Sequence, residues 1–449
     1  MTGDHTKLPA RYWRQWSAGA ISNLGDGINF VAMPLLVLSL TTDERVLALS
    51  TFALFVPWLL IGLPVGIGVD RFNRKHLMAG ASFLRCGLFA LTAWLVTSDH
   101  LSVAALVGLL VVIGCCEVVF DSASQAFLPM LVPTDQLARA NGLLFAAEVV
   151  AGSVAGLSVG ALLFEESPSL PFTVNAVSFF VAAVLIVSIA VRRETPLTAH
   201  TDLRLSAGIG WLRNHRTLRT LAAMFTVTNF GLMFGQGIFV KYAIETLGLT
   251  PLGYGLLLAI TAMGAATGGL IGHRVIRRFG LARSVIGPYL VFGVAQVVIG
   301  LAPDAWLVGA AGYFLGAAIT VWNVVTVTIR QQLIPADMFG RVNAVYRWFG
   351  AAASATGVAC GGLLAYWTNL KMPFLVGGVV VAAAATLVGL TRGLGLSKRI
   401  SGRVKDHLEQ ALTLTILGEG SALATFSAEV ERITGTVLKE LDDAATVSD

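Results

Sequence analysis

The fold is decided by a short segment, GIGVDRFNRK at residues 66–75, that joins two long apolar runs. The runs extend from about 47 to 69 and from about 76 to 98, and each is long enough to cross a bilayer as a helix. Ten further runs of this kind lie on either side, at about 16–40, 102–128, 141–164, 172–191, 218–242, 253–276, 283–301, 305–331, 343–367 and 373–391. The sequence therefore predicts an all-α membrane protein with twelve transmembrane helices.

The composition agrees with this prediction and excludes several other classes of protein. Of the 449 residues, 55% are hydrophobic and 13% are charged, whereas a soluble domain has about 25% charged residues. So few charges cannot cover the surface of a soluble protein. The cysteines all lie in apolar runs, without the spacing of metal ligands or of a disulfide framework (Cys86, Cys115, Cys116 and Cys360). We therefore expect no metal and no cofactor. The apolar composition, with few charged residues, also excludes a nucleic-acid partner.

The distribution of Lys and Arg predicts the orientation in the membrane. Twelve spans place both termini on one side, and 27 of the 31 Lys and Arg residues fall in segments on that side. The loops on the other side contain only Arg45, Lys241 and Lys371. Cytoplasmic loops are enriched in Lys and Arg, so the sequence predicts a multi-pass protein with both termini in the cytoplasm. The net charge of +5 is then a sign of topology.

The two halves of the chain resemble each other. PTDQLARAN at 133–141 matches PADMFGRVN at 335–343, and NLG at 23–25 matches NFG at 229–231. A parallel repeat of this size is typical of transporters built from two pseudo-symmetric six-helix bundles, with the substrate site between the bundles near the midplane. The predicted order is a cytoplasmic N-terminus, a first bundle, a cytoplasmic linker with an interfacial helix, a second bundle and a cytoplasmic helical tail (1–15, 16–191, 192–217, 218–392 and 393–449).

The segment at 66–75 resembles the G-x-x-x-D-R-x-x-R-K signature of the major facilitator superfamily, and it lies in the loop where that family carries it. The resemblance implies a transporter that works by alternating access. It also implies a cytoplasmic gate, in which glycine allows close helix approach and a charged cluster ties neighbouring helix ends together (Gly66, Asp70, Arg71, Arg74 and Lys75). The alternative is that the basic residues only enforce topology.

Further matches indicate one branch of this superfamily. FDSASQAFLP at 120–129, with NLGDG at 23–27 and Arg85, resembles the macrolide-efflux and enterobactin-exporter-like proteins. This resemblance implies a bacterial multidrug or siderophore exporter in the cytoplasmic membrane. The fifth run keeps three of the four glycines of the superfamily's antiporter motif, but Leu157 stands where that motif has proline and Ala161 where it has its last glycine. The glycines predict close packing on a neighbouring helix (Gly152, Gly156 and Gly160). Without the proline, the sequence does not predict whether the helix is kinked at Leu157.

Ionisable residues inside the apolar runs are the main functional candidates, because each costs about 2.5–3.5 kcal/mol at the bilayer centre. The acidic ones all belong to the first half, which carries Asp26, Glu117, Asp121 and Glu148 together with Arg85. We expect Glu117 to pair with Arg85, either as a structural ion pair or as part of the gate.

Asp26 and Glu148 have no evident basic partner in the sequence, so we expect them to couple transport to protons or substrate, with Glu117 as a third candidate. Loss of hydration favours a neutral carboxyl group, which a proton carrier requires. Asp121 lies near the cytoplasmic end of its run and is expected to join the gate through an arginine of the signature segment (Arg71 or Arg74). The alternative for these acids is a neutral, hydrogen-bonded structural role.

Uncharged polar residues in the runs are expected to complete the walls of a central cavity. The alternative for each of them is a hydrogen bond between helices. The candidates are Asn23, which shares a helix face with Asp26, and Asn29, Gln125, Asn229, Gln236, Gln296 and Asn323.

The sequence thus predicts a proton-coupled exporter of a lipophilic or amphiphilic small molecule, such as a drug, an antibiotic or a siderophore-like compound, acting as a monomer in the lipid bilayer. Export of an endogenous metabolite, an uptake porter and, with less support, a non-transporting receptor or scaffold are the alternatives. We expect no enzyme, because GLSVG at 156–160 lies within an apolar helix and not at the strand-to-helix turn of a nucleophile elbow. The sequence also has no Walker A or HExxH motif.

Overall fold

The computed structural model describes residues 8–62, 65, 72–133, 136–190, 210, 212–334 and 336–390. All regular secondary structure in these ranges is helical. Several predicted features lie outside the described residues: part of the signature segment (Gly66, Asp70 and Arg71), most of the linker at 192–217, and the tail at 393–449. The side chain of Gln125 is also outside them.

The first half of the chain forms helices where the apolar runs predict the first six spans. The fifth of these spans is continuous but changes type along its length, from α-helix through a nine-residue π-helix, η4, back to α-helix. The bounds are α1 Ala10–Leu40, α2 Glu44–Leu60, α4 Arg74–Thr97, α5 Val103–Phe127, α6 Leu137–Ala147, η4 Glu148–Gly156, α7 Leu157–Glu166 and α8 Leu170–Val187.

The second half forms the other six. Its first span is bent by 44° between α10 and the segment Phe239–Thr246, which consists of α11 and a short π-helix, η5. The bounds are α10 Arg216–Gln236, α11 Phe239–Lys241, η5 Tyr242–Thr246, α12 Pro251–Phe279, α13 Leu281–Leu301, α14 Ala305–Leu333, α15 Ala336–Trp367 and α16 Met372–Leu390.

The predicted all-α fold with twelve spans is confirmed. Within the described ranges, nine helices are long and apolar enough to cross a bilayer, and the bent pair makes a tenth. The remaining two predicted spans correspond to α2, with 17 residues, and α16, with 19.

Short polar motifs between the apolar runs determine where several helices begin. The side chains of Asp43, Asn73, Ser102, Thr250 and Asp304 accept hydrogen bonds from backbone N–H groups in the first turns of α2, α4, α5, α12 and α14. Such N-caps satisfy donors that have no partner within the helix. The start of each of these spans is therefore encoded locally.

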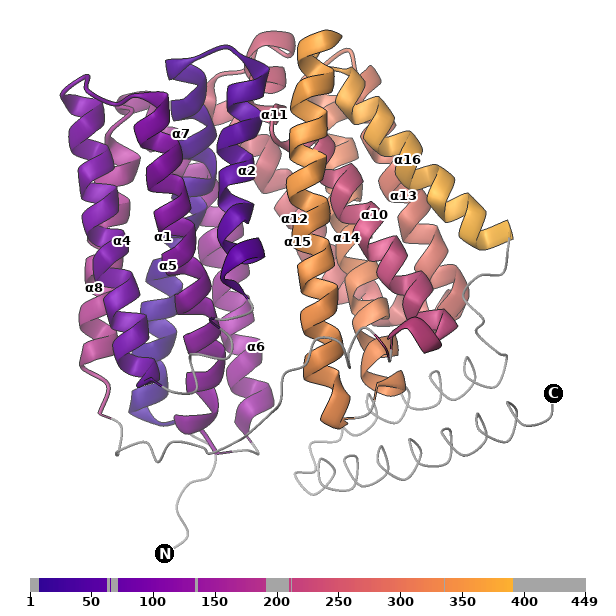
Figure 1. Ribbon diagram of the computed structural model, residues 1–449, viewed down its shortest axis with the longest axis horizontal. Coiled ribbons are helices and arrows are strands. Elements are labelled where there is room, and N and C mark those ends of the chain that lie inside the picture. Colours follow the sequence, from indigo (N-terminus) through magenta and orange to yellow (C-terminus); the bar gives the residue numbers. More distant parts are fainter. Residues whose placement is uncertain are drawn as a thin grey trace, which may run out of the picture.

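The helices form two groups that meet along the middle of the molecule (Figure 1). In the first group, α1 and α4 pack on α8, and in the second, α10 packs on α15 and α13 on α16. Across the middle, α2 packs against α15 and α7 against α12. The two groups lie close together at the end where α1 stops and diverge toward the end where α1 begins.

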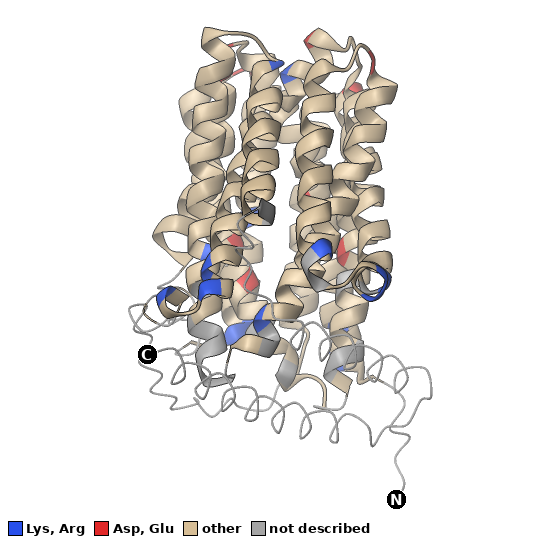
Figure 2. Cartoon of the chain, turned by 90° about the vertical axis from the view of Figure 1, so that its right-hand side faces the viewer, with Lys and Arg blue, Asp and Glu red and all other residues tan. Residues whose placement is uncertain are grey.

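The two ends of the molecule differ in charge. We call the end where α1 begins the basic end and the opposite one the far end. The positions of Lys and Arg, in blue, gather at the basic end, whereas the far end shows few of them (Figure 2). The folded molecule therefore shows the same charge asymmetry as the loops in the sequence.

Glycines let the fifth span lie directly against α1. A Cβ atom at Gly156 would lie 2.8 Å from Gly27 Cα, and one at Gly160 would lie 2.6 Å from the carbonyl oxygen of Ile28. Both distances are shorter than van der Waals contact, so a larger residue would push the helices apart. Just before Leu157, which stands in place of the motif's proline, the chain is π-helical. The irregularity at this place in the fifth span is therefore a π-helix, a feature that is often found at functional sites.

Candidate functional site

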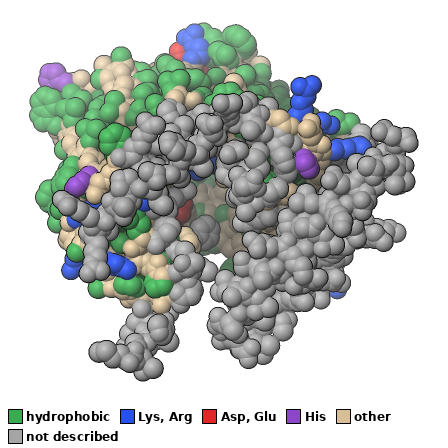
Figure 3. Space-filling view, turned by 60° about the horizontal axis from the view of Figure 1, so that its bottom comes forward, with side chains coloured by type: hydrophobic (Ala, Val, Ile, Leu, Met, Phe, Trp, Pro, Cys, Tyr) green, Lys and Arg blue, Asp and Glu red, His purple; other side chains and the backbone are tan. Residues whose placement is uncertain are grey.

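A cavity of about 960 Å³ lies between the two groups of helices. Its walls come from α1, α5 and the fifth span on one side and from α10–α14 and α16 on the other. Seen from the basic end, the molecule is hollowed between the two groups, and acidic side-chain atoms are visible inside (Figure 3). Sites that enclose drug-sized ligands have volumes of about 300–1,000 Å³, so the cavity is large enough for such a ligand.

The first-half wall of the cavity is acidic. Asp26 of α1, Glu117 and Asp121 of α5, and Glu148 at the start of η4 all line it. The two acids of α5 are four residues apart and therefore share one face of that helix. Uncharged polar side chains lie among the acids: Asn23, Ser124, Asn141 and Ser153.

No charged side chain lines the second-half wall among the residues that the structure describes. The described residues that line it are mostly aliphatic, with Phe239 of α11 and Phe374 of α16 adding aromatic surface. Its polar side chains are those of Gln236, Thr261 and Gln296, and Gln296 Nε2 donates a hydrogen bond to the Gly231 carbonyl oxygen at 3.1 Å. A ligand in the cavity would therefore meet carboxyl groups on one side and mainly hydrocarbon on the other.

Arg85 pairs with Asp26, which corrects two predictions. Its Nη2 atom donates to Asp26 Oδ1, and its guanidinium carbon lies 3.9 Å from the centroid of the Phe179 ring. Arg85 is 2% exposed, whereas Asp26 is 39% exposed and faces the cavity. The expectation that Asp26 has no basic partner is wrong, and Glu117 is not the residue bonded to Arg85. The reason is that α8 carries Phe179 and α4 carries Arg85 to the depth of Asp26, a register that spacing along the chain does not reveal.

The gate predicted around the signature segment is described only in part. Arg74 Nη1 contacts Met130 Sδ at 3.2 Å, and Lys75 Nζ donates to the Ile189 carbonyl oxygen at 2.7 Å. These contacts tie the start of α4 to the segments that follow α5 and α8, all within the first half. Asp121, the predicted partner of Arg71 or Arg74, lines the cavity. Arg71 lies outside the described residues.

Three of the predicted wall residues lie elsewhere. Asn229 Nδ2 donates to the Phe225 carbonyl oxygen at 2.8 Å, and its Oδ1 accepts from Ser354 Oγ at 3.3 Å, which links α10 to α15. Asn323 is exposed on α14, and Asn29 of α1 is half-buried away from the cavity lining. Asn229 and Asn323 lie four residues from the lining residues Met233 and Ile319, so they share the cavity-facing side of α10 and α14 but lie nearer the basic end than the lining. The other predicted polar residues with described side chains, Asn23, Gln236 and Gln296, line the cavity.

Sequence reasoning missed the apolar lining. Phe30, Phe120, Met233, Phe239 and Phe374 all line the cavity. Every span is rich in such residues, so no local signal marks the ones that face the centre. Among the polar residues missed, Asn141 had a signal, because it ends the repeated PTDQLARAN segment.

The acidic wall is suited to binding positive charge. In the described ranges, no group of three or more His, Cys, Asp or Glu side chains is arranged to hold a metal ion. The acids are spread along one wall from α1 to η4, so they can attract a cationic ligand or exchange protons with water in the cavity.

Comparison with known proteins agrees with this architecture. Residues 10–414 match the family described as transmembrane secretion effector, a family of the major facilitator superfamily. Macrolide efflux protein A of Streptococcus pyogenes is 20% identical over 84% of this chain and 94% of its own length. The multidrug efflux pump Tap of Mycolicibacterium fortuitum is 25% identical over 81% of this chain and 93% of its own.

Solved structures show the same fold. A bacterial homologue of the iron transporter ferroportin, in its inward-facing state, superposes with a TM-score of 0.71 at 17% identity, over 87% of this chain and all of that one. The nucleoside transporter NupG gives a TM-score of 0.68 at 11% identity. Together with the family match over most of its length, these findings show that the chain belongs to the transmembrane secretion effector family of major facilitator superfamily transporters and is not an enzyme.

Proposed function

We propose that this transporter exports positively charged amphiphilic small molecules from the cytoplasm of a bacterium in exchange for protons. The observation that carries the proposal is the division of the cavity into an acidic wall and an uncharged, mainly apolar wall. An amphiphilic cation would place its charged group against the first wall and its hydrocarbon against the second. The efflux proteins among its relatives support export over uptake.

The orientation in the proposal rests on the charge of the two ends, whereas the direction of transport rests on the efflux proteins among the relatives. Loops rich in Lys and Arg stay in the cytoplasm, so we place the basic end on the cytoplasmic side, together with both termini. On this orientation the cavity opens toward the cytoplasm, as an exporter requires for taking up its load. Because one chain supplies both walls, we propose that the monomer is the transporting unit in the bilayer.

Proton exchange is assigned to the acidic wall. A proton that binds to Glu148, Glu117 or Asp121 neutralises a carboxylate and so displaces a cation held there. Protonation of Asp26 would also release its ion pair with Arg85. One-for-one exchange of a proton for a monovalent cation moves no net charge, so one pH unit supplies about 1.4 kcal/mol, enough for a concentration gradient of about tenfold. A second proton per cation would add about 3.7 kcal/mol from about 100 mV and one pH unit.

The proposal is tested by dye accumulation in bacteria that lack their own efflux pumps. We expect wild-type protein to lower accumulation of ethidium, a cation, much more than that of Nile red, a neutral lipophilic dye. An uncoupler, Asp26→Asn or Glu148→Gln should each abolish the effect. Glu166→Gln is the matched control, because Glu166 is an exposed acid at the far end of α7. Equal ethidium accumulation with and without the wild-type protein would contradict the proposal.

A further inference from the structure

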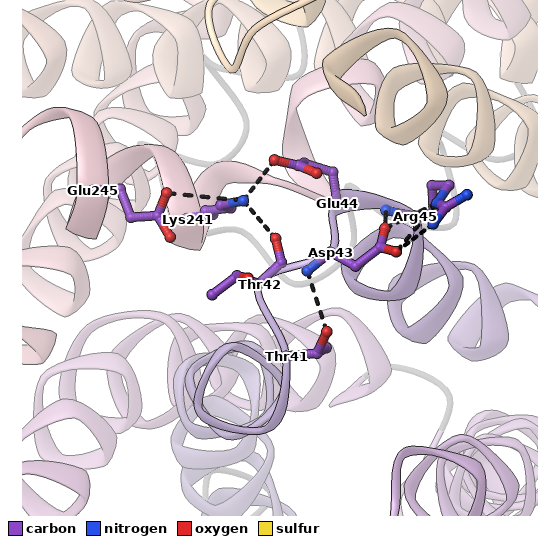
Figure 4. Close-up of polar contacts among 7 residues, drawn as sticks. All are labelled: Thr41, Thr42, Asp43, Glu44, Arg45, Lys241 and Glu245. Atoms are coloured by element: carbon purple, nitrogen blue, oxygen red, sulfur yellow. Dashed lines mark hydrogen bonds and ion pairs between the residues drawn. The ribbon is translucent and has the colours of Figure 1, made fainter. Parts of the chain in front are cut away.

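At the far end, a buried lysine of the second half bonds to the first half. Lys241, the last residue of α11, is 7% exposed. Its Nζ atom donates to the Thr42 carbonyl oxygen and to Glu44 Oε1, both at 2.5 Å. Thr42 lies in the turn between α1 and α2, and Glu44 is the first residue of α2; Figure 4 shows the lysine reaching across to both. One ammonium group thus joins the two halves of the transporter.

Lys241 also has a partner in its own half. Glu245 lies one helical turn further along, with its Oε2 atom 3.8 Å from Lys241 Nζ (Figure 4). Glu245 is 43% exposed, whereas Glu44 is 19% exposed. If the halves separate, Thr42 and Glu44 move away with the first half, but Glu245 stays beside the lysine. The ammonium group therefore keeps a partner in a separated state.

Close packing of small residues lies near this contact. A Cβ atom at Gly362 of α15 would lie 2.2 Å from the Cβ of Ala48 in α2, and one at Gly237 would lie 3.4 Å from the Ala48 Cα. Beside them, the guanidinium carbon of Arg45 lies 4.1 Å from the centroid of the Tyr366 ring. The far end is thus closed by contacts between α2 and the segments Gly237–Lys241 and α15.

The closing contact and the cavity share one segment of chain. Gln236 and Phe239 both line the cavity, and they stand on either side of Gly237 and Ile238, where the helix bends. Lys241 follows Phe239 by two residues. A displacement of this bent segment would therefore move a part of the cavity wall and the lysine together.

We propose that Lys241 is a positioning residue of the transport cycle: its bonds to Thr42 and Glu44 hold the far end closed while the cavity is open at the basic end. To open the far end, the transporter breaks these bonds, and the ammonium group turns to Glu245 and water. The inference rests on the proposed function, because it assumes that the cavity opens at each end in turn. It goes beyond it by assigning the closed far end to one side chain.

The test measures a distance across the far end. Spin labels replace His100, between α4 and α5, and Pro303, between α13 and α14, both exposed, in a variant without the four natural cysteines. We expect Lys241→Met to raise the population with a long label-to-label distance by about tenfold or more, because removing one partner of a buried ion pair strongly destabilises the state that buries it. Lys371→Met, a matched change of an exposed lysine near the start of α16, should leave the populations unchanged.

Two further variants keep the test decisive. Glu44→Gln should shift the populations in the same direction even if the lysine variant does not fold, and exchange of the charges in Lys241→Glu with Glu44→Lys should return them toward wild type. Unchanged populations in Lys241→Met or Glu44→Gln would overturn the inference. The readout needs no substrate, so a wild type that exports no ethidium would contradict the proposed function alone.

Discussion

The two halves of the chain share a repeat but divide the chemistry of the cavity between them. α1 and α10 begin 206 residues apart, and α5 and α14 begin 202 residues apart. On these offsets Asp26 corresponds to Leu232, and Glu117 corresponds to Ile319; all four line the cavity. Equivalent positions therefore build both walls, with an acid in the first half and an aliphatic residue in the second.

This difference separates what the repeat conserves from what function requires. The repeat keeps the helix positions, and with them the faces that meet at the centre. It does not keep the role of a side chain: Asn23 lines the cavity, but Asn229, its equivalent, bonds α10 to α15. We therefore assign charge and proton binding to the first half. The second half supplies the apolar wall and, separately, the lysine at the far end.

The largest effect is expected from the ion pair of the acidic wall. Asp26→Asn leaves the buried guanidinium of Arg85 without its anion, which we expect to lower the free energy of unfolding by about 1.5–3 kcal/mol and to abolish ethidium transport. Unfolding of the purified protein in detergent, followed by thiol-reactive fluorescence or denaturant titration, measures the first effect. The combined variant Asp26→Asn with Arg85→Gln removes both charges and should regain stability without regaining transport. Normal ethidium transport by the double variant would show that transport does not require the ion pair of the acidic wall.

The next effect compares two glycines at equivalent places in the repeat. Gly160→Ala forces a Cβ atom to 2.6 Å from the Ile28 carbonyl oxygen within one half, and such overpacking costs about 1–3 kcal/mol. In Gly362→Ala the new Cβ atom would meet Ala48 of the other half. Because the two halves can separate, they can make room for it. We expect the first variant to unfold more easily, and the second to keep its stability but populate the open far end more. Equal losses of stability in both would show that the halves do not separate there.

A smaller effect distinguishes the two asparagines of the repeat. Asn229→Ala removes one hydrogen bond between α10 and α15 and one within α10, and it should lower stability by about 0.5–1.5 kcal/mol, with ethidium transport retained. Asn23→Ala should leave stability nearly unchanged and raise the ethidium concentration needed for half-maximal transport. Unfolding curves and transport titrations of both variants give the comparison. The reverse pattern would mean that the cavity wall is assigned to the wrong asparagine.

The smallest effect concerns pH and compares the far end with the cavity. Hydrogen bonds from Arg45 lower the pKa of Asp43 to about 2. The stability that this pair contributes is thus present above the ordinary pKa of an aspartate, about 3.9, and is lost only as the pH falls toward 2. Asp43 stays ionised between pH 5 and 8, so Asp43→Asn, which can still cap α2, should leave the pH profile of transport unchanged. A shifted profile would place a coupling group outside the cavity.

Most of the fold was predictable because each span carries its own signal. Apolar runs marked the twelve helices, and N-caps such as Asn73 and Ser102 set where several begin. The acidic wall was predictable as well, because a charge within a bilayer is costly unless it faces a cavity or a partner. Asp26, Glu117, Asp121 and Glu148 were named on that ground, and all of them line the cavity.

The rest depends on how helices rotate and slide against one another. The bond of Arg85 to Asp26 needs the register of α4 against α1, and the bond of Asn229 to Ser354 needs the register of α10 against α15. Lys241 counted in the sequence only as one of three basic residues in the loops of the far side. Its burial follows from the approach of α11 to the turn before α2, a contact between residues about 200 positions apart.

The central claim is that an acidic wall exchanges protons for organic cations, and proton movement in proteoliposomes tests it most directly. Purified protein is reconstituted with a pH-sensitive dye inside, a pH gradient is imposed, and ethidium or Nile red is added. The account predicts that ethidium drives proton movement across the membrane through the wild type, that Nile red does not, and that Glu148→Gln abolishes the response. Ethidium transport without proton movement, or an unchanged response in Glu148→Gln, would contradict it.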